Sequence, residues 1–182
     1  WNGRRIVLHV GSAESYLDAY VNGRHAGMSK DTRLPAEFDV TDLVSTGANT
    51  LVLVVVRYSD ASFIEDQDQW WYGGLHRSVY AYSTPHTYLA DMFVKPLLSD
   101  DLSRGTLEAE FSFATTGASQ RKDRLPPHRI AVRFLDPDGR EVAVRKTNVS
   151  SSYQHGGRWT ASVEIPVAHP LLWNHEKPLL YT

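Results

Sequence analysis

Short β-prone runs separated by turn signals extend over nearly the whole chain, and no helical stripe is longer than about two turns. The clearest turn signal is Asn22-Gly23, which follows the run Tyr16–Val21 and precedes Arg24. Both central positions of a two-residue hairpin turn need a positive φ, so Asn-Gly between β-prone runs indicates a hairpin. The sequence therefore predicts an all-β fold.

A first group of strands is predicted before Pro85. Residues 5–10 and 75–82 have β-prone composition, and the run Leu51–Val56 is continuously apolar and rich in β-branched residues. Because both side-chain sets of such a run must leave water, it predicts a central strand covered on both faces. Residues 40–44 fit one short helical turn.

A second group of strands follows a junction near residues 84–88. Alternating apolar and polar side chains give two of its runs the period of a half-buried strand. The turn sequence Asp136-Pro137-Asp138-Gly139 predicts a hairpin. The predicted strands of this group cover residues 107–113, 130–134, 141–145 and 159–167. The polar, basic residues 118–128 are predicted to form a solvated surface loop, so the chain reads as two all-β units.

Composition excludes several classes of function. Nineteen Lys and Arg against 21 Asp and Glu give a net charge of −2, so no global charge attracts nucleic acid or anionic lipid. Cysteine is absent, which rules out disulfides, thiolate metal sites and cysteine nucleophiles in these residues. The longest apolar run is too short to span a bilayer, and no signal-peptide pattern opens the chain. A start without Met and an end inside an apolar run suggest an excerpt of a longer protein.

Residues 60–77 carry the most chemical interest, because clustered acids precede clustered aromatics. The acids are Asp60, Glu65, Asp66 and Asp68, and the residues that follow include Trp70-Trp71-Tyr72 and Gly73-Gly74. Carboxylates accept strong hydrogen bonds from sugar hydroxyls, and aromatic faces stack on the C–H patches of a pyranose ring. This combination fits a sugar-binding surface. It also fits a solvated acidic loop that leads into a tryptophan-anchored core strand.

Other chemistries need spacings that these residues lack. Asp66 and Asp68 match the first ligand positions of an EF-hand loop, but Trp70 stands where another oxygen ligand is required. A self-contained retaining glycosidase needs two carboxylates about 5 Å apart across the scissile bond, whereas these acids lie side by side on one segment. The eight histidines show no metal-ligand spacing, and no phosphate loop or nucleophile elbow occurs.

Several motifs resemble the large bacterial β-galactosidases of glycoside hydrolase family 2. They are Val21-Asn22-Gly23-Arg24, DTRLPAEFD at residues 31–39, Arg57-Tyr58-Ser59-Asp60, EDQDQW at residues 65–70, GLHRSV at residues 74–79 and PLLW at residues 170–173. The resemblance covers essentially all 182 residues in order. It implies the C-terminal part of a jelly-roll (galactose-binding-like) β-sandwich at residues 1–85. An immunoglobulin-like β-sandwich, truncated at its end, is implied at residues 86–182.

In this family a catalytic (β/α)₈ barrel follows these two domains. The resemblance therefore implies part of a retaining β-galactosidase that hydrolyses terminal β-D-galactosides such as lactose. The two catalytic glutamates and the Mg²⁺ belong to the absent barrel, so we expect no catalytic residue in this chain and no activity from it alone. The alternatives are a β-glucuronidase or β-mannosidase of the same family, or a noncatalytic carbohydrate-binding or interaction module.

The resemblance implies a functional role for Asp68. This residue matches an aspartate that reaches from the jelly roll into the barrel's active site, where it binds galactosyl hydroxyls and a monovalent cation, Na⁺ or K⁺. Barrel groups would complete the cation's shell, so none is expected on the 182-residue chain alone. Trp70, Gly74 and Arg77 match framework positions that support the loop.

The resemblance also implies partners and a compartment. We expect a galactoside substrate, the enzyme's own barrel domain and, at full length, a homo-oligomer in the cytoplasm, with neither nucleic acid nor membrane as a partner. Trp71 and Tyr72 depart from the family's pattern, so the resemblance assigns them no sugar contact.

Overall fold

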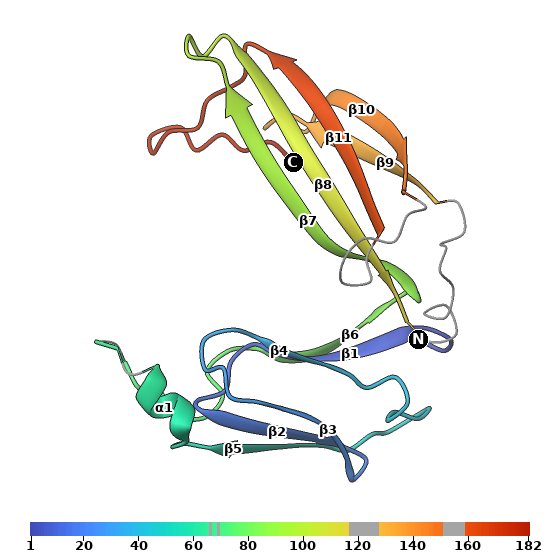
Figure 1. Ribbon diagram of the computed structural model, residues 1–182, viewed down its shortest axis with the longest axis vertical. Coiled ribbons are helices and arrows are strands. Elements are labelled where there is room, and N and C mark those ends of the chain that lie inside the picture. Colours follow the sequence, from blue (N-terminus) through green and yellow to red (C-terminus); the bar gives the residue numbers. More distant parts are fainter. Residues whose placement is uncertain (66, 69, 117–127, 151–158) are drawn as a thin grey trace. The chain divides into compact units, whose positions relative to one another are not determined.

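The computed structural model describes residues 1–65, 67–68, 70–116, 128–150 and 159–182. These residues form two compact units, Trp1–His86 and Thr87–Thr182 (Figure 1). Within the described residues, every regular element except one five-residue helix is a β-strand, and all strand pairs are antiparallel. The predicted all-β class is confirmed. The helix found in the described part of the chain is too short to cross a membrane.

The first unit consists of two three-stranded sheets, with the orders β4-β1-β6 and β3-β2-β5 (Figure 1). Their elements are β1 Arg5–Val10, β2 Tyr16–Val21, β3 Arg24–Ser29, β4 Ala36–Asp39, β5 Leu51–Val56, α1 Asp60–Ile64 and β6 Val79–Thr84. Inward side chains of both sheets, among them Leu8, Leu17 and Phe38, meet in one apolar core. The sandwich forms because alternate side chains of each strand leave water on the same face.

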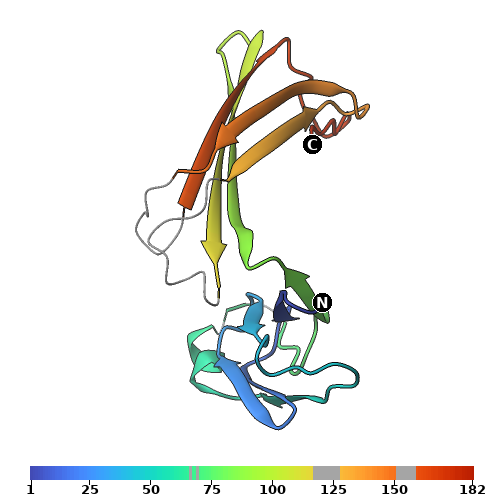
Figure 2. The same cartoon turned by 90° about the vertical axis from the view of Figure 1, so that its right-hand side faces the viewer.

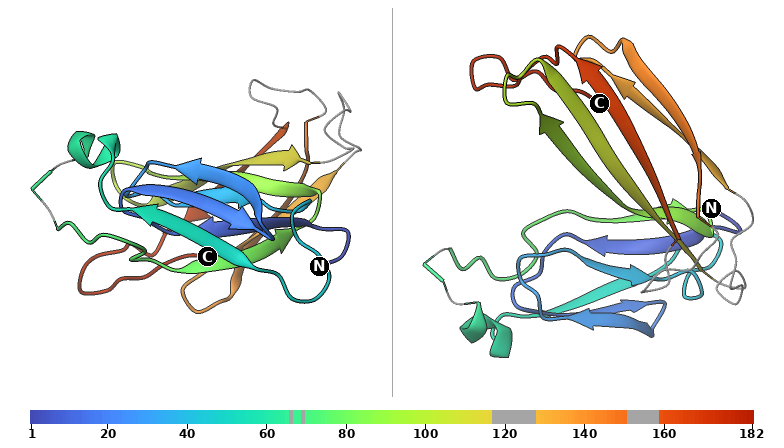
Figure 3. Two further views of the ribbon diagram at one scale, coloured as in Figure 1. Left: turned by 90° about the horizontal axis from the view of Figure 1, so that it is seen from below. Right: turned by 45° about the horizontal axis from the view of Figure 1, so that its top comes forward.

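The predicted hairpin at Asn22-Gly23 is confirmed. It joins β2 to β3 (Figure 3), and its two central residues have φ values of 52° and 76°. Both values are positive, as this tight turn requires. The side chain of Asn22 also donates to the carbonyl of Leu43 at 2.9 Å and accepts from the amide of Thr50 at 2.9 Å, which ties the turn to the neighbouring loop.

The prediction that Leu51–Val56 is a central strand covered on both faces is wrong. Among the described residues, β5 pairs with β2 alone and forms the edge of its sheet. Leu53 and Val55 pack against the core, whereas Val52, Val54 and Val56 on the opposite face are 47%, 44% and 46% exposed. The continuous apolar run therefore reflects one covered face and one face that remains open in this part of the chain.

Among the described residues of the first unit, helical structure is confined to short segments. Residues 40–44 form the predicted single turn, in which the amides of Leu43 and Val44 both donate to the carbonyl of Val40. Helix α1 was not predicted, because five residues are too few to show a helical period. The strand predicted at residues 75–82 begins later, at Val79.

The second unit combines a three-stranded sheet of order β11-β8-β7 with the pair β10-β9 (Figure 2). Its strands are β7 Thr87–Leu98, β8 Arg104–Thr115, β9 Arg129–Leu135, β10 Glu141–Asn148 and β11 Trp159–Ala168. The predicted alternation along β8 is confirmed, since Ala109 and Phe111 are buried while Glu108 and Glu110 are not. The predicted hairpin at residues 136–139 is also confirmed, and the amide of Gly139 donates to the carbonyl of Asp136 at 2.9 Å. Strand β7 was not predicted.

The described residues end in a segment that joins β9. Thr182 and Leu135 exchange two backbone hydrogen bonds of 2.7 and 3.1 Å, and the rings of Tyr181 and Phe134 stack with centroids 4.9 Å apart. The solvated loop predicted at residues 118–128 lies, except for its last residue, outside the described residues.

Candidate functional site

The acidic segment starts where β5 ends, and Ser15 anchors this outgoing part. The amide of Ser15 donates to the carbonyl of Val56 at 3.0 Å, and its hydroxyl donates to the carbonyl of Arg57 at 3.1 Å. The same hydroxyl lies 2.9 Å from that of Ser59 and 2.7 Å from that of Ser62. Ser15 is fully buried, so these contacts fix the first turn of α1 to the body of the sandwich.

Glu14, the residue before Ser15, anchors the returning part of the segment. Its carboxylate oxygen Oε2 accepts a hydrogen bond from the amide of Tyr72 at 2.8 Å. Its backbone exchanges two hydrogen bonds with Gly74, at 2.9 and 3.1 Å. Glu14 is only 6% exposed, and a buried carboxylate is tolerated because it is hydrogen-bonded.

The loop after β3 holds the segment at three further points. The amide of Thr32 donates to the carboxylate of Glu65 at 3.2 Å, and Nη2 of Arg33 lies 3.4 Å from the carbonyl oxygen of Trp70. Arg77 donates from Nη1 to the carbonyl of Arg33 at 2.7 Å. The family resemblance implies that Trp70 and Arg77 support the loop, and in the structure both contact Arg33 in the loop after β3.

The described carboxylates of the segment differ in whether other residues bind them through hydrogen bonds or ion pairs. Nζ of Lys30 lies 2.9 Å from the carboxylate of Asp60, and this hydrogen bond holds the pKa of Asp60 below its usual value. Glu65 is bound to Thr32. Asp68 is exposed, and no hydrogen bond or ion pair joins its carboxylate to any other described residue.

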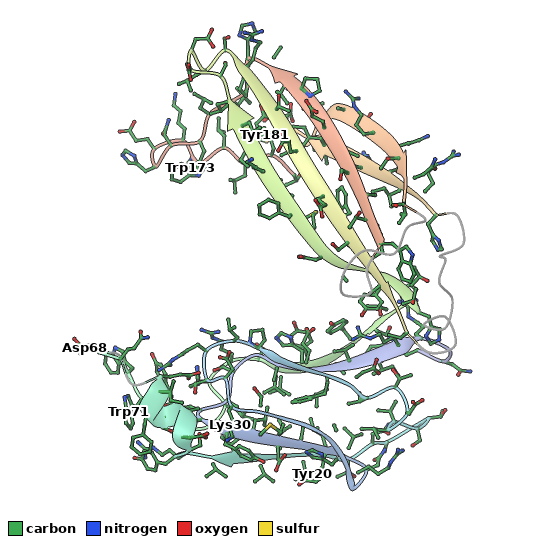
Figure 4. All side chains as sticks on the ribbon, viewed as in Figure 1. Tyr20, Lys30, Asp68, Trp71, Trp173 and Tyr181 are labelled. Carbon is green, nitrogen blue, oxygen red and sulfur yellow. The ribbon has the colours of Figure 1, made fainter. Side chains whose placement is uncertain are left out.

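Asp68 lies at the outer end of the segment beyond α1, whereas Lys30 lies close to the helix (Figure 4). Because no other described residue binds the carboxylate of Asp68, its oxygens can accept a ligand. Asp66, the remaining acid of the group, lies outside the described residues.

The aromatic residues of the segment lie at the surface. Trp70 is 78% exposed, and Trp71 and Tyr72 are also exposed. Tyr72 stacks on His76 with ring centroids 5.0 Å apart, and Trp71 makes a tilted contact with Tyr58. The interpretation of this run as a tryptophan-anchored core strand is therefore wrong, because the chain here follows the surface of the unit instead of entering a sheet.

Sequence reasoning missed two groups that support the segment. One is the pair Glu14 and Ser15, and the other is Ser12, whose hydroxyl lies 2.7 Å from Nε2 of His76. The only local signal is an acid among small residues in Gly-Ser-Ala-Glu-Ser directly after a strand. That pattern does not reveal partners that lie more than forty positions away along the chain.

The described residues supply no closed metal site, and the cavity found in the first unit lies away from the acidic segment. Among them, no three His, Asp or Glu side chains come close enough together to hold a metal ion. A cavity of about 790 Å³ in the first unit is lined by residues such as Ile6, Val44 and Asn49, and by none of the acidic segment. What this region offers chemically is one exposed carboxylate that no other described residue binds, on a loop anchored at both ends.

Sequence comparison assigns both units to one family. The family model described as "Glycosyl hydrolases family 2, sugar binding domain" matches residues 1–85, and that described as "Glycosyl hydrolases family 2" matches residues 87–182. The chain is 33% identical over 184 residues to a β-galactosidase of Priestia megaterium, which covers 100% of this chain and 17% of the relative. A β-galactosidase of Vibrio cholerae is 34% identical over 183 residues, with 97% and 17% covered. The chain thus spans about a sixth of the length of these relatives.

Solved structures with the same fold include β-glucuronidases. The enzyme of Bacteroides uniformis gives a TM-score of 0.82 at 22% identity, over 100% of this chain and 22% of that chain. The enzyme of Bifidobacterium dentium gives 0.76 at 23% identity, over 99% of this chain and 33% of that chain. At these identities the likeness establishes the fold. Because the two family models together match nearly every residue, the chain belongs to glycosyl hydrolase family 2.

Proposed function

We propose that this chain is part of a retaining β-galactosidase, in which Asp68 forms one wall of the pocket for a terminal β-D-galactosyl group. Two curated relatives at 33% and 34% identity are named β-galactosidases. The observation that carries the role of Asp68 is its exposed carboxylate, which no other described residue binds although the described acids near it are engaged. A carboxylate in this state can accept hydrogen bonds from sugar hydroxyls without first breaking others.

The bond-breaking groups of the proposed enzyme lie elsewhere in the polypeptide. In retaining hydrolysis, one carboxylic acid protonates the glycosidic oxygen and a second carboxylate attacks the anomeric carbon. We assign both roles, together with any Mg²⁺, to a barrel domain outside these residues. The 182-residue chain supplies binding and orientation, and on this proposal it hydrolyses nothing alone.

A monovalent cation, Na⁺ or K⁺, is part of the same proposal. Hard cations prefer anionic and neutral oxygen ligands, and the exposed carboxylate of Asp68 fits the role of one such ligand. Among the described residues no group of three His, Asp or Glu side chains could hold a metal ion, so the remaining ligands would come from the barrel. The cation would supply positive charge that holds Asp68 and nearby hydroxyl oxygens together.

The test is the variant Asp68→Asn in the full-length protein, assayed with p-nitrophenyl β-D-galactoside over a range of Na⁺ concentrations. Removing the anionic oxygen is expected to lower kcat/KM by about tenfold or more and to weaken the response to Na⁺. Asp42→Asn, at an exposed position elsewhere in the first unit, is the matched control and should behave as wild type. Wild-type kinetics with an unchanged Na⁺ response in Asp68→Asn would remove Asp68 from the pocket.

Substrate choice separates this proposal from its alternatives. The full-length protein is expected to hydrolyse the β-galactoside faster than the matching β-glucuronide or β-mannoside. Faster hydrolysis of the β-glucuronide or the β-mannoside would identify the protein as a β-glucuronidase or a β-mannosidase instead. Binding of galactosides with no hydrolysis of any of the three would indicate a noncatalytic carbohydrate-binding module.

A further inference from the structure

We propose that Glu14 is the positioning residue for Asp68, because its buried carboxylate fixes the returning part of the loop and so sets where Asp68 lies. This inference rests on the role proposed above for Asp68. Glu14 itself is too deeply buried, at 6% exposure, to touch a substrate. Its effect on the reaction would therefore pass through the loop.

The first argument is the number of loop contacts that one residue makes. Oε2 of Glu14 accepts the amide hydrogen of Tyr72 at 2.8 Å, and the backbone of Glu14 pairs with Gly74 in both directions. Since burial excludes competing water, this contact resists opening.

The second argument is the short distance along the chain between the anchors and Asp68. Tyr72 follows Asp68 by four residues, a stretch that spans at most about 14 Å when fully extended. On the other side, Glu65 precedes Asp68 by three residues, and its carboxylate accepts a hydrogen bond from the amide of Thr32. The length of the chain therefore limits how far Asp68 can lie from these two anchors, and loss of the Tyr72 anchor would remove one of the two limits.

The third argument is that neighbouring residues hold opposite ends of the segment. Ser15 binds Arg57, Ser59 and Ser62 at the outgoing end, and Glu14 binds Tyr72 and Gly74 at the returning end. The width of the loop at its base is therefore set by one dipeptide of the sandwich. Through this arrangement Glu14 can influence the position of the Asp68 carboxylate without contacting it.

The experiment compares two conservative substitutions in the full-length enzyme. Glu14→Gln keeps the length of the side chain and an acceptor oxygen but loses the charge, whereas Glu14→Asp keeps the charge but is one methylene too short to reach the Tyr72 amide. If reach is what matters, Glu14→Asp lowers kcat/KM for p-nitrophenyl β-D-galactoside by about tenfold, because small misplacements of a binding group are costly. Glu14→Gln then stays within about threefold of wild type. Glu37→Asp, at a carboxylate of β4 in the same unit, is the matched control and should leave kcat/KM unchanged.

A double-mutant cycle with Asp68→Asn identifies the route of the effect. If Glu14 acts through Asp68, adding Glu14→Asp to Asp68→Asn lowers kcat/KM by less than about twofold further. Multiplication of the two single losses would overturn the inference and show a general structural role. Loss of activity in Glu14→Gln equal to that in Glu14→Asp would overturn it as well. If Asp68→Asn alone has no effect, the proposed function has failed, which is a different result from failure of the coupling.

Discussion

The guanidinium of Arg77 donates a hydrogen bond to the backbone carbonyl of Arg33 at a distance of 2.7 Å. This contact links the residues just before β6 to the loop between β3 and β4. The same loop binds Glu65 through the amide of Thr32, so Arg77 stabilises a surface that in turn holds the acidic segment. Arg77 therefore supports the segment indirectly, through a second loop.

The Arg77 contact predicts a local change in hydrogen exchange. In Arg77→Ala, the amides of residues 32–34 are expected to exchange about fivefold faster, which corresponds to the loss of roughly 1 kcal/mol from one hydrogen bond. Exchange measured by mass spectrometry on the full-length protein tests this. Arg4→Ala is the control, because Arg4 binds Ser83 and should affect residues there instead. Equal exchange in wild type and Arg77→Ala would show that the contact adds no stability.

Asp39 predicts how the stability of the first unit depends on pH. Burial raises the pKa of this carboxyl, but hydrogen bonds from Thr41 and Arg5 outweigh that effect and hold the pKa below its usual value. A carboxyl with a lowered folded-state pKa contributes stability above its unfolded pKa, near 4, and loses that contribution as the pH falls through the folded pKa. The wild type should therefore melt at a higher temperature than Asp39→Asn at pH 7.

This advantage over Asp39→Asn should shrink as the pH is lowered below about 4, because the wild-type carboxylate then becomes protonated. Thermal unfolding of both full-length proteins, measured at intervals from pH 7 to pH 3, gives the comparison. A constant difference over that range would mean that the Asp39 carboxylate does not contribute through its charge.

The close approach of Gly27 to the ring of Phe38 predicts that a larger residue at position 27 lowers the stability of the first unit. A Cβ atom placed on Gly27 would come within 2.5 Å of Cδ1 of Phe38, whose ring belongs to the core. Gly27→Ala is therefore expected to destabilise the first unit by about 1–3 kcal/mol, the usual cost of overpacking. Combining it with Phe38→Leu should cost less than the sum of the two single changes, because the smaller side chain gives way. Strictly additive losses in denaturant unfolding would place the strain elsewhere.

The turns and the alternating strands of this chain could be predicted because their signals are local. Asn22 and Gly23 adopt positive φ values that few other residue pairs tolerate, so their chemistry alone specifies the hairpin. In β8, apolar and polar side chains alternate along the strand, and this alternation indicates directly which side chains face the core. The error at Leu51–Val56 arose because burial of a second face depends on whether another layer covers the strand, and no local pattern contains that information.

The support of the candidate site was harder to predict than its acids. Asp68 is one of four clustered carboxylates, and only the family resemblance singles it out. The bond from Tyr72 to Glu14 joins residues 58 positions apart, and it exists only because the fold brings the start of β2 beside the end of the loop. Interactions of this kind follow from the tertiary structure, and no local sequence pattern predicts them.

The open face of β5 predicts that the 182-residue chain, expressed by itself, associates. Alternate valines of this strand are nearly half exposed, and among the described residues β5 has no neighbour on its outer side. An apolar strand at the edge of a sheet is a template for pairing with another chain. Val54→Lys should reduce association, since a charged side chain on an edge strand opposes such pairing.

Sedimentation velocity of the 182-residue chain over a range of concentrations measures this association. Thr46→Lys is the control, because it adds the same charge to an exposed loop position while leaving β5 unchanged, and it should associate as the wild type does. If the wild-type chain is a single monomeric species that unfolds cooperatively, the exposed valines of β5 do not drive association. Equal reduction by both lysine variants would mean that net charge, and not the strand edge, controls it.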